Sequence, residues 1–257
     1  MPQTTVKDIL SFLAELAQNN NRDWFQANKP RYDACRKYFE SLTQEYIDGL
    51  TTIDPSLSGL QPKQCIWRIY RDVRFSADKR PYKEWFGTFP ASGTPEQPNS
   101  YGKHSMRGGY YLHLQPGHCL FAGGIWCPSP NLLTALRKEI LANYDEVEQI
   151  MSNPLWKRYF GDFDTDWMLK KIPAGFEEQL NEISDQLTDS PSPRFTKITA
   201  WLKRKAYTFS TPLTDAQVCA PDFMSRLLDI ARAAKPMNDF LNYTFEEFGE
   251  FPDRCTR

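Results

Sequence analysis

Apolar residues recur at helical spacing over roughly the first 50 positions of the chain. One run follows Thr5 at intervals of three and four and consists of Ile9, Phe12, Leu13 and Leu16; a second stripe consists of Tyr32, Cys35, Phe39, Leu42 and Tyr46. The segment between them, residues 19–28, is rich in Asn, a residue that suits helix ends and helix caps. The pattern predicts an antiparallel pair of helices, with a short turn at residues 22–25.

Strand-like alternation follows in residues 66–75. One face would carry Trp67, Ile69, Val73 and Phe75 with Arg71 among them, and the other face Arg68, Tyr70, Asp72 and Arg74. Residues 76–81 are expected to form a loop, and residues 82–89 a second strand. Two further strands, residues 109–115 and 119–126, flank the dipeptide Pro116-Gly117, which is typical of a hairpin turn.

Glycine and proline mark the remaining features of this region. Residues 90–107 are rich in Gly, Pro, Ser and Asn, which predicts a long surface loop. Gly123 and Gly124 fall inside the expected strand at residues 119–126 and indicate a bulge, or a close approach of other backbone or of a ligand. From Pro130 onward the apolar spacing is mostly helical again, with one strand expected near residues 207–211.

Helices, then strands, then helices again are typical of an α+β protein rather than of alternating βαβ units. We expect one domain over residues 1–257, with an antiparallel or mixed sheet of about four or more strands. Helices would pack at one face of the sheet. The N-terminal pair and the C-terminal half of the chain would both be helical.

Charge is distributed unevenly along this chain. Residues 63–83 hold seven Lys or Arg against two Asp, a local balance of +5, whereas the whole chain has a net charge of −1. The remainder therefore sums to −6. A near-neutral chain is not expected to coat nucleic acid or a membrane surface in general, but a local basic site is compatible with these numbers.

Cysteine usage and the N-terminus favour the cytoplasm. The six cysteines are scattered and contain no CxxC pair, so we expect reduced thiols. Residues 1–8 lack the apolar core of a signal peptide, and no apolar run approaches the ~20 residues of a membrane span. The sequence predicts a soluble, cytoplasmic protein with no membrane partner.

Seven short motifs are spread over most of the chain: Asn20–Phe25 with Asn28 and Lys29, Arg68–Phe75 with Asp78 and Lys79, Pro81–Lys83, Gly109–His113, Gly123–Trp126, Lys170–Phe176 and Trp201–Lys205. Together they resemble a known family, the one catalogued as domain of unknown function 2461. The resemblance covers roughly residues 9–243. It implies a single-domain α+β protein, found mainly in bacteria, and it brings no established activity with it.

The Arg-rich segment is the leading candidate for a binding site, because Arg donates paired hydrogen bonds to carboxylate or phosphate. Arg68 and Arg74 lie about 20 Å apart on an extended strand, at roughly 3.3 Å per residue, so they cannot grip one phosphate together. We expect an anionic small molecule, a class that includes phosphorylated compounds, in a pocket walled by this strand (residues 66–75) and the loop after it (residues 76–83). The candidate ligand-binding residues are Arg68, Tyr70, Arg71, Arg74, Lys79, Lys83 and Arg22. The Lys203–Lys205 run could complete such a site.

His113 is the best candidate for acid–base chemistry, because imidazole titrates near neutral pH. It shares a strand face with Tyr111 and Gln115, but no partner for it is visible in the sequence. His113, His118 and Cys119 match no tetrahedral ligand spacing, so no metal is expected. The chain contains no nucleophile elbow, no phosphate-binding Gly-rich loop and no HExxH motif. Enzymatic activity and cofactors are left open.

Two other interpretations compete with anion binding. In one, the protein is a nucleic-acid-associated module, in which basic residues track phosphates while Tyr70, Phe75, Tyr82 and Trp85 stack on bases. In the other, it is a structural or interaction domain, in which the arginines pair with carboxylates and have no ligand.

Overall fold

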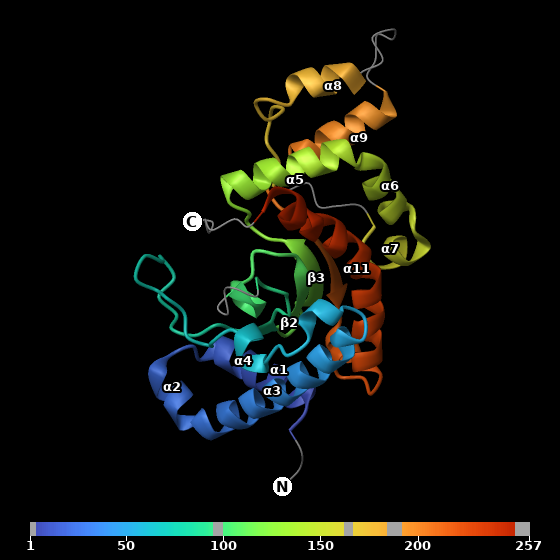
Figure 1. The fold of residues 1–257 in the computed structure, drawn as a ribbon. Helices are drawn as coiled ribbons and strands as arrows, with labels where there is room; N and C mark the ends of the chain where they lie inside the picture. Colours follow the sequence, from blue (N-terminus) through green and yellow to red (C-terminus); the bar gives the residue numbers. More distant parts are fainter. Residues whose placement is uncertain (1–3, 95–99, 162–166, 184–191, 250–257) are drawn as a thin grey trace. The chain divides into compact units, whose positions relative to one another are not determined.

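A computed structural model describes residues 4–94, 100–161, 167–183 and 192–249. The chain divides into two compact units (Figure 1). The first comprises residues 1–105, 109–123 and 210–235, and the second comprises residues 106–108, 124–209 and 236–257. The expectation of one domain over residues 1–257 stays a prediction.

The first unit begins with helices α1 (Val6–Gln18), α2 (Arg22–Ala27) and α3 (Lys29–Thr51), followed by the short helices η1 (Pro55–Leu57) and α4 (Pro62–Cys65). The predicted helical pair is confirmed as α1 and α3. Thr5 and Asp8 form a capping box at the start of α1, as their spacing indicates. Residues 22–25, expected as a turn, instead belong to α2, because the Asn21 side chain accepts the Trp24 amide and caps a new helix.

Four strands form one antiparallel sheet in the order β1-β2-β3-β4. They are β1 (Phe86–Thr88), β2 (Gly109–Leu114), β3 (Cys119–Ile125) and β4 (Tyr207–Leu213). Phe86 pairs with Leu114 and Thr88 with Leu112 in the β1–β2 ladder. The α+β class, the β2–β3 hairpin and the strand near residue 207 are therefore confirmed.

The sheet of the first unit has a covered face and a more accessible face. Leu112 and Leu114 of β2 are buried, and on β1 the Phe86 ring lies 5.3 Å from the Phe39 ring of α3. Tyr111 and His113 alternate with these residues and are half-buried on the opposite face. Helix α3 therefore supports one face, as the sequence predicts, and leaves a second face on which polar and aromatic groups gather.

The predicted strand at residues 66–75 is wrong in its extent. Only isolated bridges join Ile66 to Thr88 and Tyr70 to Tyr82, so residues 66–71 and 81–89 form a loosely paired antiparallel ribbon. Arg71 donates its amide to the Pro81 carbonyl, but Pro81 has no amide hydrogen to return. The chain beyond residue 71 then leaves the pairing for a loop. We call residues 66–83 the Arg ribbon.

The segment predicted as a long surface loop is tied down where the structure describes it. Ala91 is fully buried, and its carbonyl accepts the Gly102 amide at the start of helix η3 (Gly102–His104). Gly102 has a positive φ of 61°, and a Cβ there would lie 2.6 Å from the Gln64 carbonyl oxygen. Residues 95–99 lie outside the described residues. The end of this segment at η3 is thus held against α4.

The second unit contains the predicted C-terminal helices. These are α5 (Pro130–Ala142), α6 (Tyr144–Ser152), α7 (Pro154–Tyr159), α8 (Glu177–Ile183) and α9 (Pro193–Leu202). Two later helices differ: α10 (Asp215–Val218) belongs to the first unit, and α11 (Phe223–Phe248) has residues in both units. The Trp156 ring lies 4.8 Å from the rings of Phe160 and Phe209 in the core of this unit.

Gly124 confirms the expected close approach of backbone. It has a φ of +85°, and a Cβ there would lie 2.0 Å from the carbonyl oxygen of Tyr207 in β4. No residue with a side chain can occupy this position without moving the neighbouring strand.

Two sequence-based expectations concern the environment of the protein. In the ranges that the structure covers, no helix is long and apolar enough to cross a membrane.

Cys35, Cys65, Cys119 and Cys219 are free thiols, but Cys127 is disulfide-bonded. The expectation of reduced cysteines throughout is therefore wrong at Cys127. Spacing along the chain does not show which cysteines meet in the fold, because bonding needs a close approach of their Cα atoms.

Candidate functional site

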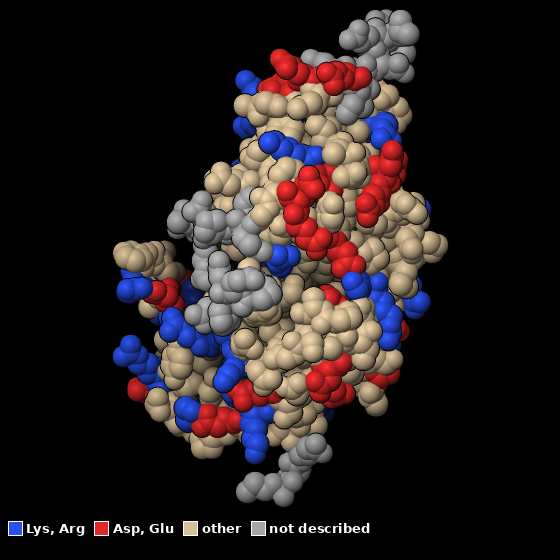
Figure 2. Space-filling view, viewed as in Figure 1, with Lys and Arg blue, Asp and Glu red and all other residues tan. Residues whose placement is uncertain are grey.

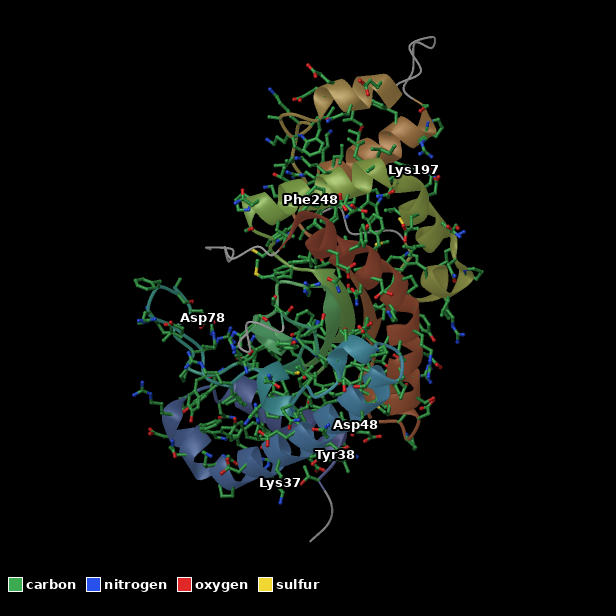
Figure 3. The ribbon with its side chains drawn as sticks, viewed as in Figure 1. Lys37, Tyr38, Asp48, Asp78, Lys197 and Phe248 are labelled. Atoms are coloured by element: carbon green, nitrogen blue, oxygen red, sulfur yellow. The ribbon has the colours of Figure 1, made fainter. Side chains whose placement is uncertain are left out.

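Most arginines of the Arg ribbon are already paired with carboxylates. Arg71 donates from Nη1 to Asp78 Oδ2 at 2.7 Å, and Arg74 donates from Nη2 to Asp72 Oδ2 at the same distance. Arg80 binds both oxygens of Asp78, which lies on the loop at the end of the ribbon (Figure 3). These hydrogen bonds hold the pKa of Asp78 well below its usual range. This end of the ribbon is thus an ion-pair network.

Arg68 and Arg22 differ from these residues. Both are exposed, and neither makes a hydrogen bond or an ion pair through its side chain with the residues that the structure describes. Arg22 opens helix α2, where it is close enough to lower the pKa of Tyr82 slightly against the raising effect of burial. Arg68 lies within the ribbon, one residue before Ile69, whose carbonyl accepts the Lys83 amide. Two of the predicted site arginines therefore remain open to a ligand.

Both predicted lysines donate to backbone carbonyls. Lys79 Nζ lies 3.0 Å from the Val73 oxygen, and Lys83 Nζ lies 2.7 Å from the Arg68 oxygen. Lys79 is exposed, but Lys83 is half-buried. Burial, followed by the charges of Arg68 and Lys103, lowers the pKa of Lys83 to about 8. Lys83 therefore combines burial with two neighbouring positive charges.

Lys103 completes a cluster of three cations that the sequence does not reveal. It donates from Nζ to the Lys63 carbonyl oxygen at 2.6 Å, and burial is the main cause that lowers its pKa. None of Arg68, Lys83 and Lys103, here called the cationic cluster, pairs with a carboxylate in the described ranges. Lys103 lies in the segment predicted as a loop, where no periodicity marks it. In Figure 2, Lys and Arg side chains gather around the loop on which Figure 3 labels Asp78.

Aromatic rings on the accessible face of the sheet lie beside the cationic cluster. Lys83 Nζ is 5.1 Å from the centre of the Trp85 ring, a cation–π distance. The Trp67 ring lies 6.2 Å from the Trp85 ring and 5.4 Å from the Tyr111 ring. All three are half-buried, and we call them the aromatic face. Gly87 makes room for it, because a Cβ there would lie 2.8 Å from the Trp85 ring.

His113 is held between two side chains of its own strand. The Tyr111 hydroxyl lies 2.7 Å from His113 Nδ1, and the Gln115 oxygen lies 2.9 Å from Nε2. Because the Gln115 oxygen only accepts, Nε2 carries the proton and Tyr111 donates to Nδ1. Burial is the first cause that lowers the pKa of His113, so the ring is neutral near pH 7. Both nitrogens are thus engaged by neighbouring side chains, and the acid–base role of His113 stays a prediction.

Residues 8–240 match a family described as conserved hypothetical protein (DUF2461). The chain belongs to this family. A comparison with curated proteins and with solved structures gives no match.

In this DUF2461 chain, the Asn-rich segment of residues 19–28, here called the Asn-rich elbow, is mainly structural. Asn20 donates from Nδ2 to the Tyr82 carbonyl, and its Oδ1 accepts the Tyr82 amide, so the side chain imitates a strand partner. Asn28 donates to the Trp24 carbonyl and so finishes α2 rather than capping α3. Tyr70 is 45% exposed, with its ring 5.5 Å from that of Tyr82. The elbow thereby fixes the base of the Arg ribbon.

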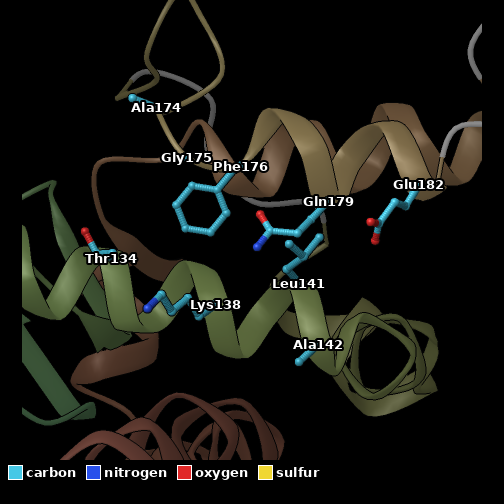
Figure 4. A pocket seen from close by; sticks show the side chains of 9 residues that line it. All are labelled: Thr134, Lys138, Leu141, Ala142, Ala174, Gly175, Phe176, Gln179 and Glu182. Carbon is cyan, nitrogen blue, oxygen red and sulfur yellow. The ribbon is translucent and has the colours of Figure 1, made fainter.

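The second unit contains fewer of the candidate site residues than the first. Of the Lys203–Lys205 run, Arg204 is buried, and its carbonyl accepts a bond from Arg137. An open groove of about 460 Å³ lies between α5 and α8 (Figure 4), with Thr134, Lys138, Leu141, Ala142, Ala174, Gly175, Phe176, Gln179 and Glu182 along it. It contains none of the predicted site residues. In the described part of the DUF2461 chain, no group of three His, Cys, Asp or Glu residues could hold a metal ion.

Proposed function

We propose that the first unit binds a small anionic ligand, a phosphate or carboxylate compound, at the cationic cluster beside the aromatic face. The observation that carries this proposal is Lys83. Its amine is half-buried next to Arg68 and Lys103, and its hydrogen-bond acceptor is a neutral carbonyl. Burying a cation beside two others is unfavourable unless an anion approaches them. A bound anion would relieve this repulsion.

Each member of the proposed site has a distinct task. Arg68 is exposed and can offer two parallel N–H groups to a phosphate or carboxylate. Lys83 and Lys103 supply positive charge from a partly desolvated position, where attraction to an anion is stronger than in water. Trp85 and Trp67 supply apolar ring surface next to the charges. The site therefore favours an anion that also carries an apolar or planar group.

The seven residues predicted from the sequence do not contribute equally to this proposal. It centres on Arg68 and Lys83, while Arg22 and Tyr70 are exposed and could reach a larger ligand. Arg71 and Arg74 would first have to leave Asp78 and Asp72. Lys79 lies at the exposed end of the ribbon. A cytoplasmic location, a bacterial source and an enzymatic role for His113 remain predictions.

The test compares inorganic phosphate with phenyl phosphate by calorimetry and thermal unfolding. We expect phenyl phosphate to bind more tightly. Arg68→Ala should weaken both ligands by roughly 10- to 100-fold, the usual worth of hydrogen bonds to a charged group. Arg74→Ala is the matched control, because that exposed arginine is paired with Asp72. Equal binding by the wild type and the Arg68→Ala and Lys83→Met variants would disprove the proposal.

A nucleic-acid-associated role is the second candidate. Phe75 is 95% exposed, and the Arg74 guanidinium lies 5.8 Å from the centre of its ring. An exposed ring beside a cation can stack on an unpaired base. The carboxylate pairing of Arg71, Arg74 and Arg80 argues against it. Binding of a single-stranded oligonucleotide that weakens steeply with salt and is lost in Phe75→Ala would favour this role.

The structural interpretation also has support, since Asp78 joins Arg71 and Arg80 in one network. It does not account for the cationic cluster. If Arg68→Ala lowers the melting temperature without any ligand and no anion binds the wild type, the arginines are structural alone.

A further inference from the structure

We propose that Lys83 is a reactive amine that condenses with a carbonyl group of the bound anionic compound and holds it as an imine. This inference rests on the proposed anion site, and it adds a covalent step and a substrate class. The class is an aldehyde or ketone that bears a phosphate or carboxylate group.

The position of the amine is the first argument. Lys83 Nζ is held by one hydrogen bond of 2.7 Å to the Arg68 carbonyl oxygen, and it lies above the Trp85 ring at 5.1 Å. In the described ranges, no carboxylate pairs with it. An amine in a tight ion pair must break that pair before it can attack, whereas a bond to a neutral carbonyl is more easily exchanged. The Trp85 ring limits water on one side of the amine.

The charge state of the amine is the second argument. Only the neutral form of an amine is a nucleophile, and lysine in water is almost fully protonated near pH 7. Burial and the neighbouring cations of Arg68 and Lys103 lower the pKa of Lys83 to about 8. Lysines activated by desolvation and by a nearby cation are the ones that form imines in enzymes. The same cations that attract the anionic group thus keep part of the amine neutral.

The step is balanced in atoms and charge. The nitrogen lone pair attacks the carbonyl carbon, the C=O π bond breaks, and a carbinolamine forms. The nitrogen loses protons as the oxygen gains them, and the oxygen leaves as water. A C=N bond then joins Lys83 to the ligand. No oxidant or reductant takes part, and hydrolysis reverses the step.

Lys79 is the natural comparison within the same ribbon. It also donates to a backbone carbonyl, but it is exposed, so its amine is not desolvated. Lys103 belongs to the cationic cluster but donates to the Lys63 carbonyl. Among the residues that the structure describes, it makes no ring contact like that of Lys83 with Trp85. The geometry therefore singles out Lys83 among these three amines.

The experiment uses pyridoxal 5′-phosphate as a probe, because it combines a planar ring, a phosphate and an aldehyde. The full chain is treated with the probe and cyanoborohydride at pH 7, and the reduced adducts are mapped by mass spectrometry. Lys83 should be labelled at least about tenfold more than Lys79, since each unit of pKa lowering raises the neutral fraction about tenfold. Excess inorganic phosphate should suppress the label on Lys83 and leave that on Lys79 unchanged.

The variant Lys83→Arg separates the two proposals, because it keeps the positive charge and cannot form an imine. It should retain stabilisation by phosphate and show no labelling above the background of other lysines. Labelling of Lys83 no greater than Lys79, with phosphate still stabilising the wild type, overturns the imine and leaves the anion site. A different result would overturn the anion site. In that case Lys83 is strongly labelled, excess phosphate does not suppress the label, and phosphate does not stabilise the protein. Mapping of the adducts on the wild type tests the reactivity of Lys83 even if the variant fails to fold.

Discussion

Lys83 donates a 2.7 Å hydrogen bond from its side-chain amine to the backbone carbonyl of Arg68, across the Arg ribbon. The same two residues are also joined electrostatically, because the Arg68 charge lowers the pKa of Lys83. One contact thus stabilises the ribbon while the other destabilises the protonated amine. This opposition leads to a measurable dependence of stability on pH.

We expect Lys83→Met to remove part of the pH dependence of unfolding. The pKa of Lys83 is about 8 in the folded chain and about 10.4 in an unfolded one, so between these values the unfolded chain binds more protons. The penalty is full below pH 8 and disappears as pH rises toward 10.4. Wild-type stability should therefore rise relative to Lys83→Met between pH 7.5 and pH 9.5, in urea unfolding at both values. Lys79→Met is the control, and an equal change in it would contradict the assignment.

Removal of the Tyr111 hydroxyl should destabilise the first unit modestly. Tyr111→Phe leaves His113 Nδ1 without its donor, which costs about 0.5–1.5 kcal/mol for a lost hydrogen bond. Urea unfolding at pH 7.5 measures the change. Tyr70→Phe is the matched control, since no hydrogen bond to the Tyr70 hydroxyl is found in the described ranges. A loss in the control as large as in Tyr111→Phe would point to a general effect of the substitution.

His113 should make the fold sensitive to mild acid. Its folded pKa is lowered, so the folded chain binds fewer protons than the unfolded chain below about pH 6.5. The stability contributed by the neutral ring is present above that pH and is lost as pH falls toward the folded pKa. The imidazole NMR signal that disappears in His113→Gln should titrate below the ordinary range. Titration of that signal at or above pH 6.5 would rule this out.

Gly87→Ala should displace the aromatic face. Its Cβ would lie 2.8 Å from the Trp85 ring and 3.0 Å from the Tyr111 hydroxyl oxygen. Overpacking of this kind costs about 1–3 kcal/mol, and near-ultraviolet circular dichroism should change with it. Gly59→Ala has strained backbone at φ +80° but no atom within 4 Å, so it should lose stability without the spectral change. An unaltered spectrum in Gly87→Ala would show that the rings can repack freely.

Asp78→Asn should loosen the end of the Arg ribbon. The carboxylate accepts from Arg71 and Arg80, and an amide cannot form both charge-assisted contacts. We expect faster tryptic cleavage of residues 71–80 and a stronger affinity for phosphate, because Arg71 loses its carboxylate partner, Arg80 loses one of its two partners and keeps Glu84, and one negative charge is removed. Asp72→Asn, which removes the hydrogen-bonded partner of one arginine, Arg74, should change both quantities less. Unchanged cleavage in Asp78→Asn would mean that backbone contacts alone hold the loop.

The predictable parts of this fold are those in which local spacing decides the structure. The apolar stripe from Ile9 to Leu16 specifies α1, and Pro116-Gly117 specifies the β2–β3 turn, because both patterns act over a few residues. The alternation around His113 also indicates correctly that Tyr111 and Gln115 share its face. In the Arg ribbon the alternation is equally clear, yet the strand fails where Pro81 cannot donate. Regular pairing depends on the partner strand, which the alternation of one segment does not reveal.

Local spacing and composition specify the α+β class, the N-terminal helical pair, the helical C-terminal half and the concentration of positive charge at residues 63–83. Which of those charges are neutralised depends on contacts that form only in the folded chain. The tertiary structure pairs Arg71 with Asp78, and it brings Lys103 from a segment without periodicity to Lys83 and Arg68. Burial and the approach of distant charges set the electrostatics of an amine, and both arise only when the chain folds.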